Sequence, residues 1–135
     1  MDNEERLNAL RKFFTADRYV ALSGIEIDEV TDEYAQVSAK ILPCHLNAGG
    51  AVQGGMLFTA ADFAFAVLCN DKHPVTVTQS ANISYIRAAK TESITARAVE
   101  ITRTGHNCVV EVTVKDAEGN IVCVCCMNGF ISERK

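Results

Sequence analysis

The stretch from residue 42 to residue 70, LPCHLNAGGAVQGGMLFTAADFAFAVLCN, constrains the chain most, because it joins a glycine-rich loop to a long apolar segment. Its only carboxylate is Asp62 and its only imidazole is His45. A carboxylate in so apolar a segment is costly to bury unless it is paired or hydrogen-bonded. Gly54 and Gly55 lie where the loop is expected to become a helix, so backbone N–H groups without helical partners point outward there. Such a helix start favours a developing negative charge.

The loop and helix therefore offer a place for an oxyanion and, about two turns further on, a carboxylate. A carboxylate can serve as a base or a nucleophile, and an N–H donor can stabilise an oxyanion. Two plainer readings stay open: Asp62 as a buried aspartate that bonds loop backbone, and Gly54 as a glycine required by a tight turn or close packing. We interpret His45 as structural and expect His73 and His106 in solvated turns.

Length and charge limit the class of protein. A chain of 135 residues is expected to form a single domain, residues 1–135, with a sizeable core. Its net charge of −4 argues against nucleic acid as a partner. The charged N-terminus lacks the pattern of a signal peptide. Asp62, near the centre of the longest apolar run, argues against a membrane span.

The six cysteines predict reduced thiols. Cys123, Cys125 and Cys126 crowd one expected strand, where neighbouring side chains alternate between faces and cannot bridge easily. The sequence has no CxxC pair, and the adjacent Cys44 and His45 lack companions at metal-ligand spacing. We therefore expect a cytoplasmic protein that binds no metal.

Residue periodicity predicts the order of helices and strands. Apolar residues at helical spacing predict a helix over residues 3–15 that is capped by Asn3, followed by a connector over 19–24. A buried helix of about 16 residues is expected from Gly54 onward. Alternating apolar residues predict strands at 24–30, 34–42, 75–86, 93–104, 106–115 and 121–132, with hairpin turns at 31–33 and 116–120.

This element order indicates an α+β architecture, in which antiparallel strands accompany one segregated helix. A helix that is apolar nearly all round must be buried on most of its faces. A twisted sheet curled around it is the simplest arrangement for a chain of this size. The outer face and the edges of such a sheet stay partly apolar, so we expect self-association.

The motif HLNAGGAVQGGMLFTAADFAFAVLCN and the element order together resemble the hotdog-fold acyl-CoA thioesterases, in particular the PaaI-like branch of phenylacetic acid degradation. That group has the pattern N-x-x-G-x-x-H-G-G, followed by a helix with an acidic residue about two turns in. The later stretch NISYIRAAK, residues 82–90, resembles the family's third long strand and the turn after it. The resemblance spans residues 22–132. The residues that match the motif are Asn47, Gly50, Gln53, Gly54, Gly55 and Asp62.

The resemblance implies an acyl-CoA thioesterase that releases a free acid and CoA, without a cofactor because CoA is part of the substrate. It implies that the Gly54 N–H polarises the thioester carbonyl. Asp62, reached from the neighbouring subunit, would act as general base or nucleophile. Asn47 would orient the attacking water or the thioester, and Thr78 would assist the water. Because the family's sites lie at a dimer interface, the expected assembly is a dimer or a dimer of dimers.

Further substrate contacts are predicted around the motif. Gln53, Gly55 and Asn82 fall within the matching stretches. Arg87 and Lys90 flank the turn after the third long strand. Their cationic groups pair well with phosphate, so they are candidates for binding CoA, with solvated surface charges as the alternative.

Gln53 departs from the family pattern, which usually has His at this position. Gln donates a hydrogen bond but does not titrate near neutral pH, so a proton-transfer role is lost. A non-catalytic acyl-CoA-binding module on the same fold is therefore the alternative. A hotdog-fold dehydratase fits less well, because no His is well placed beside Asp62.

Overall fold

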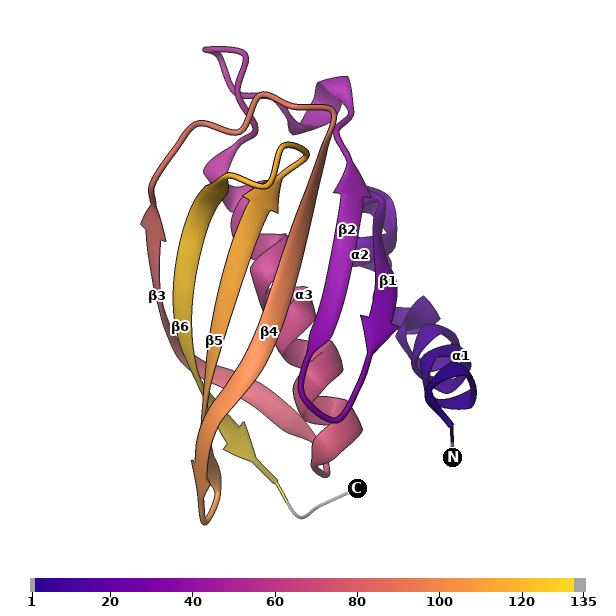
Figure 1. Cartoon of the computed structure of the whole chain (residues 1–135). Coiled ribbons are helices and arrows are strands. Elements are labelled where there is room, and N and C mark those ends of the chain that lie inside the picture. Colours follow the sequence, from indigo (N-terminus) through magenta and orange to yellow (C-terminus); the bar gives the residue numbers. More distant parts are fainter. Residues whose placement is uncertain (1, 133–135) are drawn as a thin grey trace.

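A curved antiparallel sheet of six strands wraps around one long helix, α3 (Gly54–Lys72), in the computed structural model, which describes residues 2–132 (Figure 1). The strand order across the sheet is β1-β2-β4-β5-β6-β3. The strands are β1 (Ile25–Val30), β2 (Ala35–Lys40), β3 (Thr76–Tyr85), β4 (Ser93–Thr104), β5 (Asn107–Asp116) and β6 (Ile121–Ile131). The α+β arrangement and the six strands confirm the prediction, and the strand ends differ from it by two residues at most.

Helix α3 lies against the concave face of the sheet and supplies much of the core. It has 19 residues, more than expected, because it continues through Asp71 and Lys72. A basic residue in the last turn complements the helix dipole, which favours this extension. Ten of its side chains are buried. Phe58, Thr59 and Asp62 are only half-buried, so they mark the face of the helix that the sheet leaves uncovered.

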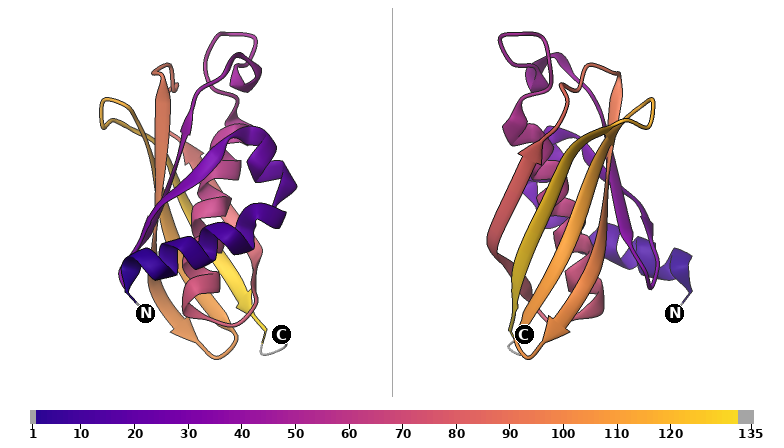
Figure 2. Two further views of the ribbon diagram at one scale, coloured as in Figure 1. Left: turned by 90° about the vertical axis from the view of Figure 1, so that its right-hand side faces the viewer. Right: turned by 60° about the vertical axis from the view of Figure 1, so that its left-hand side comes forward.

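Two helices precede the sheet, α1 (Asn3–Phe13) and α2 (Arg18–Ser23), joined by the short 3-10 turn η1 (Phe14–Ala16). Figure 2 (left) shows α1 crossing in front of the lower part of α3. The predicted cap at Asn3 is wrong by one residue, because Asp2 Oδ1 accepts the Glu5 N–H at 2.8 Å.

The predicted connector over residues 19–24 is also wrong, since most of it is helix α2. Asp17 caps this helix by accepting the Val20 N–H at 3.1 Å. The helix ends at Gly24, which has a φ of 73°, a conformation that favours glycine.

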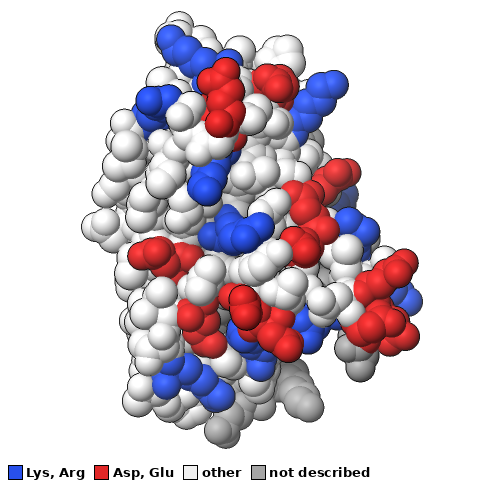
Figure 3. Space-filling view, in the orientation of Figure 1, with Lys and Arg blue, Asp and Glu red and all other residues white. Residues whose placement is uncertain are grey.

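The two edges of the sheet differ in charge. Edge strand β1 carries three acidic residues in IEIDEV, whereas β3, TVTQSANISY, carries no Asp, Glu, Lys, Arg or His. In Figure 3 charged side chains lie over most of the visible face, whereas the outermost left margin, where Figure 1 places β3, is white. Charges protect an edge strand from pairing with another chain, so β3 is the unprotected edge.

All six cysteines lie within the described residues and are free thiols, as predicted. Cys69, Cys108, Cys123 and Cys125 are buried and behave as small apolar groups of the core. Among the described helices, none combines the length and the apolar character that crossing a membrane requires.

Candidate functional site

Asp62 and Thr78 meet where α3 faces β3. The Thr78 hydroxyl donates a hydrogen bond of 2.7 Å to Asp62 Oδ1. The Asp62 carboxylate thus has a hydrogen-bond partner. Because Asp62 is only half-buried, the carboxylate also keeps access to solvent. It lines a pocket of about 280 Å³ that also contains Tyr19 and Val20 of α2 and Phe63 of α3. The structure therefore brings two of the predicted catalytic residues together, although their roles stay predictions.

The start of α3 is arranged differently from the expectation. Gln53 is the N-cap residue, and its own side-chain Oε1 accepts the Gly54 N–H at 2.9 Å. The amide predicted to hold an oxyanion thus already has an acceptor in the free chain. On the other side, the Tyr85 hydroxyl of β3 donates to the Gly54 carbonyl oxygen at 2.9 Å. This fixes the first turn of α3 to the sheet edge.

Asn47 shapes the loop before α3. Its Oδ1 accepts the N–H groups of Gly49 and Ala51, at 2.9 and 3.1 Å. This is the turn-holding alternative to a catalytic role. Asn47, Gly54 and Arg87 nevertheless line one pocket of about 300 Å³.

The other predicted substrate contacts are dispersed. Gln53 and Gly55 lie beside Gly54 at the helix start and are exposed. Asn82 is exposed on β3, and Lys90 is exposed beyond the strand. Asn82 and Lys90 line neither the pocket of Asp62 nor that of Gly54. Their roles in binding stay predictions.

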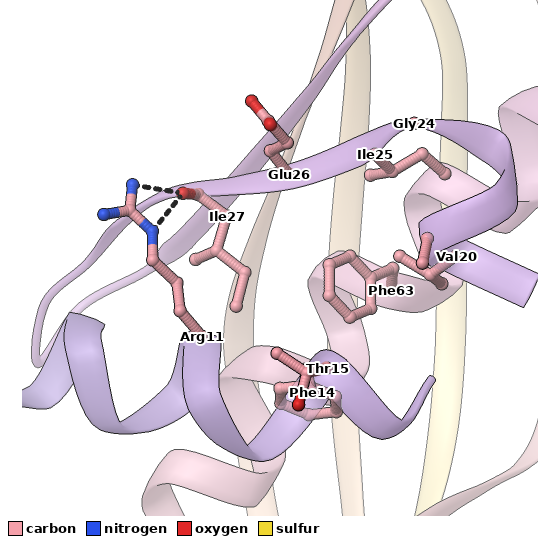
Figure 4. A pocket seen from close by; sticks show the side chains of 10 residues that line it. Arg11, Phe14, Thr15, Val20, Gly24, Ile25, Glu26, Ile27 and Phe63 are labelled. Atoms are coloured by element: carbon pink, nitrogen blue, oxygen red, sulfur yellow. Dashed lines mark hydrogen bonds between the residues drawn. The ribbon is translucent and has the colours of Figure 1, made fainter. Parts of the chain in front are cut away.

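The sequence did not predict a third and larger pocket, of about 450 Å³, between the N-terminal helices and β1 (Figure 4). Its rim holds Arg11, whose guanidinium donates to the Ile27 carbonyl oxygen at 2.8 and 3.2 Å. The rings of Phe14 and Phe63 meet edge to face in its wall, with centroids 5.2 Å apart. The sequence signal for this pocket was the set of apolar residues in the helix expected over residues 3–15, which includes Phe14. Phe63 and Val20 also line the Asp62 pocket, so the two pockets share a wall.

The charge of Asp62 acts on one thiol of β6, that of Cys125. Burial, followed by the nearby Asp62 carboxylate, raises the pKa of Cys125 to about 11. Burial also raises the pKa of Cys123 to about 11, with a further contribution from Cys125. These thiols are therefore neutral at physiological pH and offer the site no thiolate nucleophile.

None of the three histidines lines the Asp62 pocket. His45 is structural, as expected: its Nδ1 accepts the Leu42 N–H at 3.0 Å and its Nε2 lies 2.9 Å from the Ser23 carbonyl oxygen. The prediction of a solvated His73 is wrong, because its side chain is 7% exposed and its Nε2 lies 2.7 Å from Glu100 Oε1. His106 is exposed, yet its Nδ1 lies 2.8 Å from the Ile131 carbonyl oxygen.

Solved structures share this fold across most of the chain. PaaI of Escherichia coli superimposes with a TM-score of 0.81 at 21% identity, covering 93% of this chain and 96% of that one. In sequence, the acyl-coenzyme A thioesterase PaaI of E. coli K12 is 33% identical over 64 residues, which cover 47% of this chain and 46% of PaaI. A PaaI mutant of Thermus thermophilus has 27% identity and a TM-score of 0.81, covering 86% of this chain and all of that one.

A thioesterase of Streptococcus pneumoniae, described as hypothetical and solved with coenzyme A, has 25% identity and a TM-score of 0.80 over 88% of this chain and 96% of that one. Two further structures of that protein carry alanine in place of an aspartate and of a threonine. The two replaced positions are 16 residues apart, which is also the separation of Asp62 and Thr78.

The fold is the hotdog fold of the PaaI thioesterases, and the predicted resemblance to the PaaI-like thioester hydrolases is confirmed. A family model described as "Domain of unknown function (DUF4442)" matches residues 9–129. The chain therefore belongs to the DUF4442 family.

Proposed function

We propose that the protein hydrolyses an acyl-CoA thioester to a free acid and CoA, with Asp62 as the general base. The observation that carries this proposal is the half-buried Asp62 carboxylate, held by Thr78 at 2.7 Å beside a pocket. Thr78 occupies Oδ1, which leaves Oδ2 to accept a proton from water. The water oxygen then attacks the thioester carbonyl carbon, the C–S bond breaks, and the proton passes from Asp62 to the departing sulfur.

The oxyanion donor comes from a second copy of the chain. Gly54 and Asp62 are eight residues apart on one helix, which at 1.5 Å per residue separates them by about 12 Å along the axis. They also line different pockets. One thioester carbonyl cannot reach both in a single chain, so the complete site needs Asp62 of one subunit and the Gly54 N–H of the other.

The unprotected edge of the sheet supplies the surface for this second copy. Strand β3 carries Thr78 and contacts Gly54 through Tyr85. Val77 and Tyr85 on this strand are 56% and 51% exposed. Pairing of β3 with its counterpart would cover these side chains and bring the two helix starts to the two carboxylates, as a dimer or as half of a dimer of dimers.

The pockets favour an apolar or aryl acyl group. The pocket of about 450 Å³ has the size of a small-molecule site and shares Phe63 and Val20 with the Asp62 pocket. Phe14 and Phe63 in its wall suit a ring, because aromatic groups pack edge to face. Arg87, in the Gly54 pocket, is placed to bind a phosphate of CoA.

A non-catalytic acyl-CoA-binding module is the second candidate. It is favoured by one observation: the Gly54 N–H already donates a hydrogen bond to Gln53 Oε1. A thioester oxygen must displace this acceptor before the amide can stabilise an oxyanion. A pure binding module would bind acyl-CoA tightly in calorimetry and release no free thiol.

The deciding experiment measures thiol release from short, long and aromatic acyl-CoAs by the wild type, Asp62→Asn and Asp71→Asn. Asp71 is on the same helix but lies beside Arg6, so Asp71→Asn is the matched control. We expect turnover by the wild type and the control, and a loss of about 100-fold or more in Asp62→Asn. Unchanged turnover in a folded Asp62→Asn protein would remove Asp62 from the mechanism. Binding without any thiol release by the wild type would establish the binding module.

A further inference from the structure

Three potential metal ligands converge at the C-terminal end of α3, outside the Asp62 pocket, and a fourth, Cys69, adjoins one of them. One donor atom from each of His73, Glu100 and Cys108 lies within 4.8 Å of the other two. Cys69 Sγ lies 3.9 Å from Cys108 Sγ. The donors come from three elements: Cys69 and His73 from the end of α3, Glu100 from β4 and Cys108 from β5.

The local structure explains how these side chains meet. Cys69 lies in the last turn of α3, and His73 is the C-cap residue directly after the helix. The His73 N–H donates to the Cys69 carbonyl oxygen at 2.8 Å, which holds the backbone of the two residues together. Glu100 lies beside the irregularity of the β4–β5 pairing between Glu100 and Thr102. A bulge of this kind re-aims a side chain.

The cluster is buried. Both thiols are at most 1% exposed, and the side chains of His73 and Glu100 are 7% and 17% exposed. Burial raises the pKa of Cys69 and of Cys108, so both are neutral thiols when nothing is bound. The core therefore holds two thiols, an imidazole and a carboxylate together, which is a mixed set of soft and borderline donors.

We propose that Cys69, His73, Glu100 and Cys108 bind one Zn²⁺ ion in tetrahedral coordination. With Zn–S bonds of about 2.3 Å, two ligating sulfurs lie about 3.8 Å apart. This spacing is close to the 3.9 Å between Cys69 and Cys108. Ligating nitrogen and oxygen atoms lie about 3.3 Å apart, so the 2.7 Å His73–Glu100 contact opens slightly as the ion enters between them.

The surrounding charges fit a cation bound by anionic ligands. Two thiolates, one carboxylate and Zn²⁺ sum to a charge of −1, and Lys72 and Arg103 are the basic groups whose charge acts on Cys69 and Cys108. The carbonyl end of a helix also attracts a cation. Binding releases the protons of both thiols. The four protein ligands leave no open position, which is typical of a structural zinc site that ties α3 to β4 and β5.

The test is independent of thioesterase activity. Untagged protein is reduced and then dialysed with Zn²⁺ in the presence of a chelating dye. Three properties are measured: the zinc content, the shift of the thermal unfolding midpoint on adding Zn²⁺, and the thiolate charge-transfer bands with Co²⁺. We expect one zinc per chain, a raised unfolding midpoint and tetrahedral Co²⁺ bands. Cys108→Ser and His73→Gln should each weaken zinc binding by about 100-fold or more.

Two further variants keep the proposal decidable. Cys126→Ser replaces an exposed thiol and should retain full zinc binding. Glu100→Gln changes the most exposed of the four side chains and should fold normally while binding zinc at least tenfold more weakly. The proposal is overturned if the wild type takes up no stoichiometric zinc, or if folded Cys108→Ser and Glu100→Gln bind zinc as the wild type does.

Discussion

The Thr78 hydroxyl donates a hydrogen bond of 2.7 Å to Asp62 Oδ1, which ties the edge strand β3 to the uncovered face of α3. In the proposed mechanism this bond directs the carboxylate and leaves Oδ2 for the attacking water. Such a positioning role requires a hydroxyl group at this position, but either threonine or serine can supply it.

Two replacements of Thr78 should therefore separate the effect of its hydroxyl on activity from the effect of its methyl group. Thr78→Val removes the donor and should lower kcat by about 10- to 100-fold, because hydrogen bonds to charged groups contribute about 1.5–3 kcal/mol. Thr78→Ser keeps the donor and should remain within a few-fold of the wild type. Steady-state kinetics with one acyl-CoA measure both. Equal activity in the Val and Ser variants would show that the bond is purely structural.

The N-cap contact at the start of α3 predicts the behaviour of Gln53. Gln53→Glu places a carboxylate on the Gly54 N–H, where it binds more strongly than an amide oxygen and repels an oxyanion. We expect kcat/KM to fall at least tenfold. Gln53→Ala frees the N–H and should keep kcat/KM at or above the wild-type value, while the unfolding free energy falls by about 1 kcal/mol. A harmless Gln53→Glu substitution would contradict an oxyanion role for this amide.

The sequence predicted the fold well where a periodic pattern spans a whole element. The alternation around Ile94, Ala96 and Ala98 placed β4 at its observed bounds. Helix α2 was missed because it has only six residues and includes Tyr19 and Val20, which have modest helix propensity.

The site was only partly predictable from the residues themselves. The lone carboxylate of the apolar run pointed to Asp62, and the family resemblance added Thr78, which the fold brings next to it. By contrast, His73 and Glu100 are 27 residues apart and meet only through the packing of α3 on the sheet, which no local pattern encodes.

Gly129 on β6 should resist any side chain. A Cβ at this position would lie 2.6 Å from Phe65 Cζ and 2.8 Å from Cys108 Sγ, both of which are buried. Gly129→Ala should therefore lower the unfolding free energy by about 1–3 kcal/mol through overpacking. Urea unfolding measures the loss. In a Phe65→Leu background, which removes the ring, the same substitution should cost less. An equal loss of stability in both backgrounds would show that the Phe65 ring is not the source of the overpacking.

The buried thiols of β6 predict a loss of stability at alkaline pH. Burial raises the pKa of Cys123 and of Cys125 to about 11, so the unfolded chain loses these protons first. Their contribution to the unfolding free energy is complete below about pH 9 and is lost as the pH rises towards 11. At pH 10 the loss should be about 1 kcal/mol for each thiol. Urea unfolding under reducing conditions at about pH 8 and about pH 10 tests this.

A matched set of variants isolates the two thiols. The Cys123→Ala/Cys125→Ala protein should lose less stability between about pH 8 and about pH 10 than the wild type. Cys126→Ala, which removes an exposed thiol, should behave as the wild type does. An identical pH dependence in the double variant would assign the alkaline loss to other groups.

Mixed subunits test whether one active site draws on two chains. Gly54→Pro deletes the N–H at the first helical position, where proline is tolerated, and Gln53 has a ψ of 135° that suits a following proline. Gly54→Pro and Asp62→Asn should each be nearly inactive alone. Random mixing makes half of the dimers mixed, and each mixed dimer holds one intact site of two, so about a quarter of wild-type activity should return. Gly54→Ala is the control, because it adds the same Cβ near Tyr85 but keeps the N–H. If the mixture stays as inactive as its parents while Gly54→Ala is active, the acid and the amide do not act across a subunit boundary.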